Sequence, residues 1–194
     1  MKPKEELEEY AEQVSNEVGR CAAEAASRIE GWGSMPLDKL VEQVDMASTA
    51  NLKGRILEKM IARLFETVPG LTTVGRIRTV TEEIDISILN SSADPRFLRE
   101  SAILLAECKN WSGKCGKDEF VVFQNKLANR SERCSLGFLV SWNGFTETVT
   151  SEMLRGSRER LLIIPLEGKQ LRGAVRDGDF TRLVFDAWQK AVML

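Results

Sequence analysis

Residues 102–109 read AILLAECK. A run of five apolar residues followed by polar ones is typical of a buried strand. Residues two apart on a strand share a face, so Glu107 and Lys109 would project together from its end. Upstream, residues 83–89 alternate isoleucine with polar side chains, which predicts a second strand with Asp85 at its middle. The loop between the two strands would let them pair.

Further helical and extended patterns surround this strand pair. A broad apolar stripe over residues 51–68 predicts a helix that ends at Pro69-Gly70. The other expected elements are strands at 72–80, 136–141 and 161–164 and helices at 118–130, 146–158 and 179–192. Helix, three strands, helix, strand, helix and strand in this order predict an α/β sandwich with a mixed central sheet flanked by helices.

The charge distribution divides the chain into two parts. Residues 1–50 carry 11 acidic and 5 basic side chains, and residues 51–194 carry 18 and 22. Within the first part, residues 4–30 show a heptad-like seam of mostly small residues, which predicts a helix. That helix either packs on its own domain or docks on an identical or different partner chain. We therefore expect an N-terminal helical segment at 1–50, for interaction or oligomerisation, and an α/β domain at 51–194.

The composition removes several classes of chemistry. The 194-residue chain has no histidine, which excludes imidazole bases, Ser-His-Asp triads and histidine-ligated zinc. None of the four cysteines forms a C-x-x-C pair, which argues against a zinc site and for a reduced, cytoplasmic protein. The N-terminus is acidic where a signal peptide would be apolar, and the apolar runs are too short to span a bilayer.

The acidic residues offer a different chemistry. If the two strands pair, Asp85 and Glu107 lie across from each other near Lys109. Two neighbouring carboxylates repel unless a cation lies between them, and oxygen ligands suit Mg²⁺ or Mn²⁺. Glu58 falls in the apolar sector of its helix, where an unpaired carboxylate is unfavourable. The alternative is that Asp85 and Glu58 face solvent and that Glu107 and Lys109 only form a salt bridge at the end of their strand. A second acidic-x-Lys, Glu167-Gly168-Lys169, is expected in a turn.

Taken together, these residues resemble the PD-(D/E)xK nuclease superfamily, most closely its Mrr-like restriction endonuclease branch. The segments that carry the resemblance are Lys53–Glu58, Glu83–Asp85, Glu107–Trp111, Gln124 and Gly137–Thr146. The resemblance covers about residues 51–170 and implies a restriction-endonuclease-like three-layer sandwich. It also implies that a divalent metal is held by Asp85, Glu107, the Cys108 carbonyl and Glu58. Lys109 would orient water or offset phosphate charge, and Gln124 would hold the nucleophile or the lysine.

Basic residues near this motif are candidates for nucleic-acid binding. Lys109, Lys114 and Lys117 surround Trp111, which could stack on a base, and a further basic pair is Lys126 and Arg130. Such contacts to phosphates position a duplex without reading its sequence. The alternative for each set is a solvated surface, and for the tryptophan a place in the core.

These observations lead to one main interpretation and two alternatives. We expect a divalent-metal-dependent endonuclease that acts on DNA in a restriction, defence or repair system. It would act as a homodimer or with a partner protein bound through residues 1–50, away from membranes. The alternatives are a dimeric junction-resolving nuclease and a catalytically silent nuclease-like module that binds nucleic acid or protein.

Overall fold

The computed structural model describes residues 34–78, 83–130, 134–156 and 160–193. The helix predicted for residues 4–30 lies outside them, so its role stays a prediction. Within the described ranges, no helix combines the length and the apolar character that crossing a bilayer requires.

The centre of the fold is a mixed sheet whose five strands lie in chain order. The strands are β1 Leu71–Arg78, β2 Glu83–Asn90, β3 Ile103–Lys109, β4 Leu136–Ser141 and β5 Leu162–Glu167. The pairs β1–β2 and β2–β3 are antiparallel, whereas β3, β4 and β5 run parallel. The first residues of β2 therefore lie at the same end of the sheet as the last residues of β3, β4 and β5. In open α/β sheets, ligands commonly bind beyond the carboxyl ends of the parallel strands.

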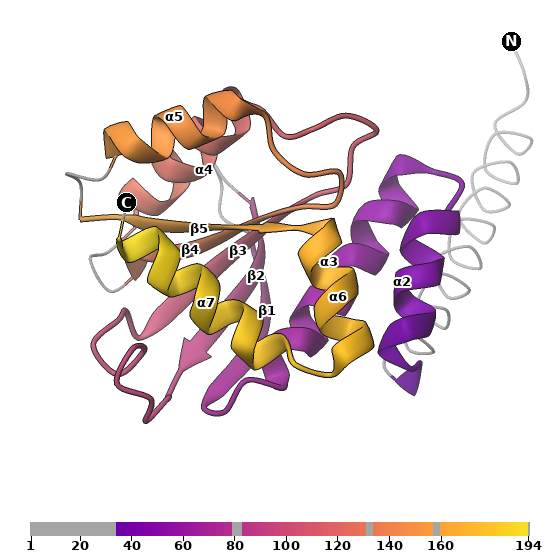
Figure 1. Ribbon diagram of the computed structural model, residues 1–194, viewed down its shortest axis with the longest axis horizontal. Helices are drawn as coiled ribbons and strands as arrows, with labels where there is room; N and C mark the ends of the chain where they lie inside the picture. Colours follow the sequence, from indigo (N-terminus) through magenta and orange to yellow (C-terminus); the bar gives the residue numbers. More distant parts are fainter. Residues whose placement is uncertain (1–33, 79–82, 131–133, 157–159, 194) are drawn as a thin grey trace, which may run out of the picture. The chain divides into compact units, whose positions relative to one another are not determined.

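Helices cover both faces of the sheet (Figure 1). They are α2 Leu37–Met46, α3 Ala50–Glu66, α4 Lys117–Ala128, α5 Glu147–Gly156, α6 Gly168–Asp177 and α7 Phe180–Val192. On one face, Phe123 of α4 belongs to the same apolar core as Leu139 of β4. On the other face, the ring of Phe65 in α3 lies 4.8 Å from that of Phe138, also in β4, and 5.3 Å from that of Phe180. The predicted three-layer α/β sandwich with a mixed central sheet is confirmed.

One helix of the structure is missing from the sequence prediction. The expectation of a turn at Glu167-Gly168-Lys169 is wrong, because β5 passes directly into α6 there. The Gln170 side chain accepts the backbone N–H of Glu167 at 2.9 Å and so caps the start of α6. A Cβ at position 168 would lie only 2.1 Å from the Trp142 carbonyl oxygen. Glycine is thus required by close backbone approach and does not mark a turn.

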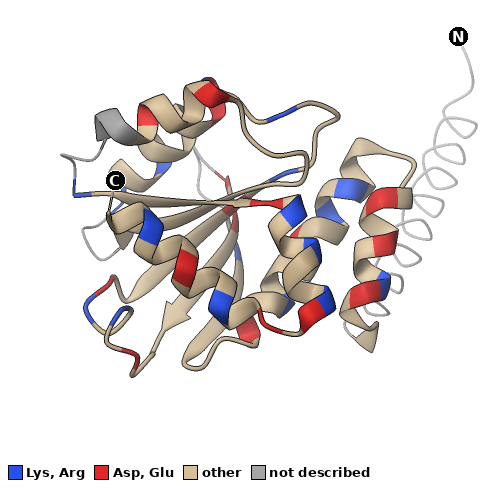
Figure 2. Cartoon of the chain, in the orientation of Figure 1, with Lys and Arg blue, Asp and Glu red and all other residues tan. Residues whose placement is uncertain are grey.

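The helix α2 belongs to the same compact unit as the sheet. This unit runs from Leu37 to Leu194, so it begins before the boundary at residue 50 that the charge distribution suggests. The Asp45 carboxylate accepts the indole N–H of Trp142 and a guanidinium N–H of Arg172, both at 2.7 Å. The guanidinium also lies 3.9 Å above the Trp142 ring. The acidic residues of α2, visible as red bands in Figure 2, therefore include one that ties α2 to β4 and α6.

Candidate active site

The candidate site lies where the first residues of β2 meet the last residues of β3, at one end of the sheet. The last pair of the ladder is Ile86 opposite Ala106, one step before Asp85 and Glu107. Beyond that pair, the Asp85 carboxylate accepts the backbone N–H of Cys108 at 2.8 Å. A side chain has thus replaced a main-chain acceptor where the two strands meet. The structure brings together Asp85, Glu107 and Cys108, as their spacing predicts.

Asp85 is an acid in an unfavourable electrostatic environment. Burial is the largest cause that raises the pKa of its carboxyl from 3.8 to about 6, and the neighbouring Glu107 and Glu58 charges act in the same direction. The N–H of Cys108 and the charge of Lys109 act in the opposite direction. A raised carboxyl pKa next to other carboxylates marks a place where a cation would be stabilising.

Glu107 is the buried acid of the site. Its side chain is only 5% exposed. The Oε1 oxygen accepts from the ammonium of Lys109 at 2.9 Å and from that of Lys126 at 2.8 Å. The Oε2 oxygen is buried and has no hydrogen-bond partner among the described residues. An orphaned buried carboxylate oxygen is costly, and binding a cation is one way to satisfy it.

Lys109 shares the face of Glu107, as expected for residues two apart on a strand. Burial lowers the pKa of its ammonium, but the charge and hydrogen bond of Glu107 outweigh this effect, so the pKa is raised. The ammonium nitrogen also lies 5.7 Å from the centre of the Trp111 ring. Lys109 therefore stays protonated beside the two carboxylates.

Glu58 reaches the site from α3, where its side chain is 20% exposed. It forms an ion pair with Arg76 of β1, which also bonds the Glu83 carboxylate at 2.7 Å. Its charge contributes to the raised pKa of Asp85, so it belongs to the same electrostatic cluster. Arg76 is a site residue that sequence reasoning missed. The residues around Arg76 on β1 form no recognisable motif. The register of β1 also shifts on both sides of Gly75, so the neighbours of Arg76 cannot be found by counting along the strand.

The helix α4 contributes Lys126. From the sequence, this lysine is expected either to bind nucleic acid or to lie on a solvated surface. The Lys126 side chain is 16% exposed, and its ammonium bonds Glu107 and, at 2.7 Å, the backbone carbonyl of Glu83. In this structure its charge therefore faces the carboxylates and not a nucleic-acid surface. Gln124 lies two residues earlier on α4 and is half-buried, as is Arg130 just beyond the end of α4.

A loop after β3 displays the remaining candidate residues. Trp111 is 49% exposed and Lys114 is exposed, whereas Lys117 pairs with Glu152 of α5 at 2.8 Å. The turn after β4 holds this loop: Asn143 donates to the Trp111 carbonyl. Further along, the Cys115 N–H donates to Gly144 at 2.9 Å and the Thr146 N–H to Cys115 at 3.0 Å. The tryptophan is presented on an anchored loop and is not a core residue.

Asn110, between the motif lysine and this loop, is a second residue that sequence reasoning missed. It is buried, and its side-chain amide donates to the Lys53 carbonyl near the start of α3 at 3.2 Å. It therefore links the end of β3 to the helix that carries Glu58. In the sequence, the position of Asn110 as a polar residue directly after a buried strand could have indicated this role.

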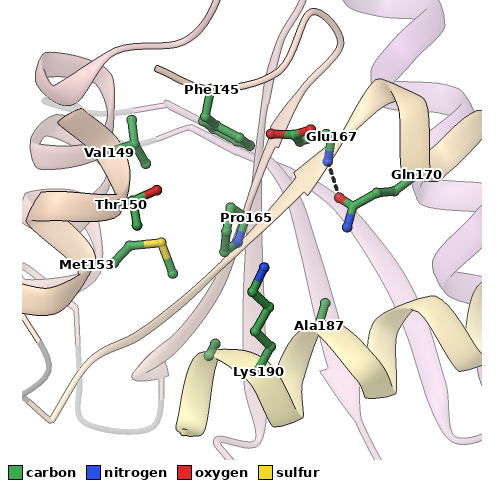
Figure 3. Close-up of a pocket in the computed structure, with 10 residues that line it drawn as sticks. Phe145, Val149, Thr150, Met153, Pro165, Glu167, Gln170, Ala187 and Lys190 are labelled. Atoms are coloured by element: carbon green, nitrogen blue, oxygen red, sulfur yellow. Dashed lines mark hydrogen bonds between the residues drawn. The ribbon is translucent and has the colours of Figure 1, made fainter. Parts of the chain in front are cut away.

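A separate cavity of about 240 Å³ lies beside β5, between α5 and α7 (Figure 3). Apolar side chains such as Phe145, Val149 and Met153 line it, together with Glu167 and Lys190. The figure shows the Lys190 side chain reaching toward Pro165 of β5. None of the acidic residues at the β2–β3 junction takes part in its lining.

The acidic site fits a divalent metal in its donor chemistry. It offers hard carboxylate oxygens, one of them buried without a partner. Among the residues that the structure describes, however, no three histidine, cysteine, aspartate or glutamate side chains are gathered as a ready metal site. Cations of the chain itself bond Glu107 and Glu58.

Comparison with known proteins identifies no family for this chain. No protein-family model and no curated protein matches the chain. One similar solved structure is the restriction endonuclease FokI, with a TM-score of 0.48 and 14% sequence identity. The similarity covers 72% of this chain and 28% of that one, so the chain matches little more than a quarter of the FokI chain.

Proposed function

We propose that the chain is a divalent-metal-dependent endonuclease of the Mrr-like type, acting on DNA in a restriction, defence or repair system. The observation that carries this proposal is the junction of β2 and β3. There the Asp85 carboxylate on the Cys108 N–H, the buried Glu107 and the Lys109 ammonium converge. This convergence adds to the sequence resemblance, because the motif residues come from two different strands.

Each residue of the cluster has a role that its chemistry supports. Asp85 and Glu107, with the Cys108 carbonyl and Glu58, would hold Mg²⁺ or Mn²⁺. When bound, such a cation supplies Lewis-acid stabilisation of an anionic phosphate. The Lys109 ammonium lies beside the carboxylates and would offset charge that develops on the phosphate. Gln124 would orient the nucleophile or the lysine.

The DNA surface we propose is the loop after β3. Trp111 and Lys114 are exposed there, and the Trp111 ring centre lies 5.7 Å from the Lys109 ammonium nitrogen. Hydrogen bonds to the turn after β4 hold the loop in place. An exposed aromatic ring beside lysines is suited to base stacking and phosphate contact. Residues 1–50 would supply a homodimer contact or a partner-protein contact.

The direct test is a cleavage panel. The full chain is incubated with supercoiled, linear, methylated, four-way-junction and single-stranded DNA, and with RNA, under Mg²⁺ or Mn²⁺. We expect cleavage of a DNA substrate that EDTA abolishes and that Asp85→Asn lacks. Equal activity of the wild-type chain and Asp85→Asn would reject the proposal, because contaminating nucleases would then explain the cleavage.

One observation favours a second candidate, a catalytically silent nuclease-like binding module. Lysine and arginine side chains already bond Glu107 and Glu58. A module of this kind would bind DNA equally well with EDTA or Mn²⁺ and would show no Mn²⁺ heat in titration calorimetry. An active nuclease would show Mn²⁺ binding that depends on Asp85 and Glu107.

A further inference from the structure

Lys126 is held more firmly than a surface lysine. Its ammonium lies 2.8 Å from Glu107 Oε1 and 2.7 Å from the Glu83 carbonyl oxygen, and the side chain is 16% exposed. These contacts join α4 to β3 and to the first residue of β2. A long flexible side chain loses conformational entropy when it is fixed in this way, and the two contacts have to offset that cost.

The opposite side of the cluster shows the same arrangement. Arg76 bonds Glu58 and the carboxylate of Glu83. Glu83 is thus contacted by two cations, Arg76 at its carboxylate and Lys126 at its carbonyl. The hydrogen bond described for Asp85 comes instead from a backbone N–H. In this state, cations of the chain itself neutralise two of the three carboxylates that we assign to the metal.

We infer that Lys126, together with Lys109, is an internal counter-ion of Glu107: it positions this carboxylate when no metal is bound, and it competes with a divalent cation for it. The inference rests on the proposed metal site. A buried carboxylate with one orphaned oxygen needs compensation by a nearby cation. An ammonium on Oε1 supplies it, but the same positive charge repels a second cation that approaches Oε2.

Because Lys126 competes with the metal, removing its charge should change the metal affinity in one predictable direction. Replacing Lys126 by a neutral residue should lower the stability of the metal-free protein, because Glu107 loses a partner. It should also make Mn²⁺ binding tighter, because a repelling charge is gone. A purely structural lysine would show the first effect without the second, and a lysine that helps to hold the metal would show weaker binding.

The experiment combines titration calorimetry with MnCl₂ and thermal melting in EDTA, using the full chain. Lys126→Met should lower the Mn²⁺ dissociation constant at least about tenfold and lower the melting temperature in EDTA. Lys126→Arg keeps the charge and should stay within about threefold of the wild-type affinity. Lys39→Met is the matched control, because Lys39 forms an exposed ion pair with Glu42 on α2, and it should change neither quantity.

The outcomes separate this inference from the proposed function. If the wild-type chain binds Mn²⁺ through Asp85 but Lys126→Met binds it equally or more weakly, the counter-ion role is overturned and the metal site stands. If neither chain binds Mn²⁺, both proposals fall. If only Lys126→Met binds it, the inference is supported. Should Lys126→Met not fold, Lys126→Gln removes the charge while keeping a hydrogen-bond donor, with the same expectation.

Discussion

The Asp85 carboxylate accepts the backbone N–H of Cys108, 2.8 Å away on the neighbouring strand. This bond holds a charged side chain at the point where the ladder between β2 and β3 ends. It also places Asp85 next to Glu107, whose charge helps to raise the Asp85 pKa. When no metal is bound, the buried charge of Asp85 lowers the stability of the folded protein. Replacing Asp85 by an uncharged residue should therefore stabilise the metal-free protein, which can be measured.

Asp85→Asn should stabilise the metal-free protein at high pH. The amide oxygen can still accept the Cys108 N–H, but the buried charge is gone. Because the folded-state pKa is about 6 and the unfolded one near 3.8, wild-type stability falls as the pH rises from about 4 to 6. Above that range, Asp85→Asn should exceed the wild-type chain by about 3 kcal/mol, and below pH 4 by almost nothing. Urea unfolding in EDTA across pH 4–8 measures this difference, and a constant offset at all pH values would contradict it.

Lys109→Ala should separate catalysis from metal binding. We expect a loss of at least about 10²-fold in cleavage rate, roughly 2.7 kcal/mol of barrier, while calorimetry still detects Mn²⁺. A surface pair worth about 0–1 kcal/mol could not produce such a loss. The matched control is Lys169→Ala in the second acidic-x-Lys, which should cleave like the wild-type chain. Wild-type cleavage by Lys109→Ala would remove the site assignment.

Asn110→Ala should loosen the link between β3 and α3. The buried amide donates to the Lys53 carbonyl, and removing it leaves that acceptor with one bond fewer. We expect a loss of about 1–2 kcal/mol in the free energy of unfolding, measured with urea. Asn125→Ala on the exposed face of α4 should stay within about 0.5 kcal/mol of the wild-type value. Equal effects of the two changes would show that the link does not stabilise the fold.

Two glycines of α6 should respond in opposite directions to alanine. A Cβ at Gly168 would meet the Trp142 carbonyl oxygen at 2.1 Å, so Gly168→Ala should destabilise by about 2 kcal/mol or more. A Cβ at Gly173 would meet nothing within 4 Å, so Gly173→Ala should stabilise by about 0.5–1 kcal/mol. Thermal melting compares the two variants, and a Gly168→Ala protein as stable as the wild-type chain would mean that the β5–α6 junction can move away from the Trp142 carbonyl without cost.

Residues 1–50 are expected to mediate self-association or partner docking. Of these, residues 1–33 can be removed without cutting into α2. Light scattering would compare the full chain with one that begins at Ser34, because α2 belongs to the compact unit and must be kept. We expect a dimer for the full chain and a monomer for the shortened one. Equal monomer masses at high concentration would remove the self-association interpretation and leave the partner-docking one.

The order of most elements and the residues of the acidic motif can be predicted from the amino-acid sequence. Local periodicity carries this information: the apolar run at 102–106 indicates a buried segment, and alternation at 83–89 indicates a half-buried strand. The loop between these strands implied that they pair. The positions of Asp85, Glu107 and Lys109 along the two strands were then enough to place the three side chains together.

Which charged side chains meet at the site depends on how the chain folds in three dimensions. Lys126 and Arg76 come from a distant helix and from an edge strand, and no local spacing relates either one to Glu107 or Glu58. The helix α6 was hidden because Gly168 looks like a turn residue, whereas its absent side chain makes room for the Trp142 carbonyl. Ion pairing and close backbone approach depend on three-dimensional proximity, so a pattern read along one segment cannot encode them.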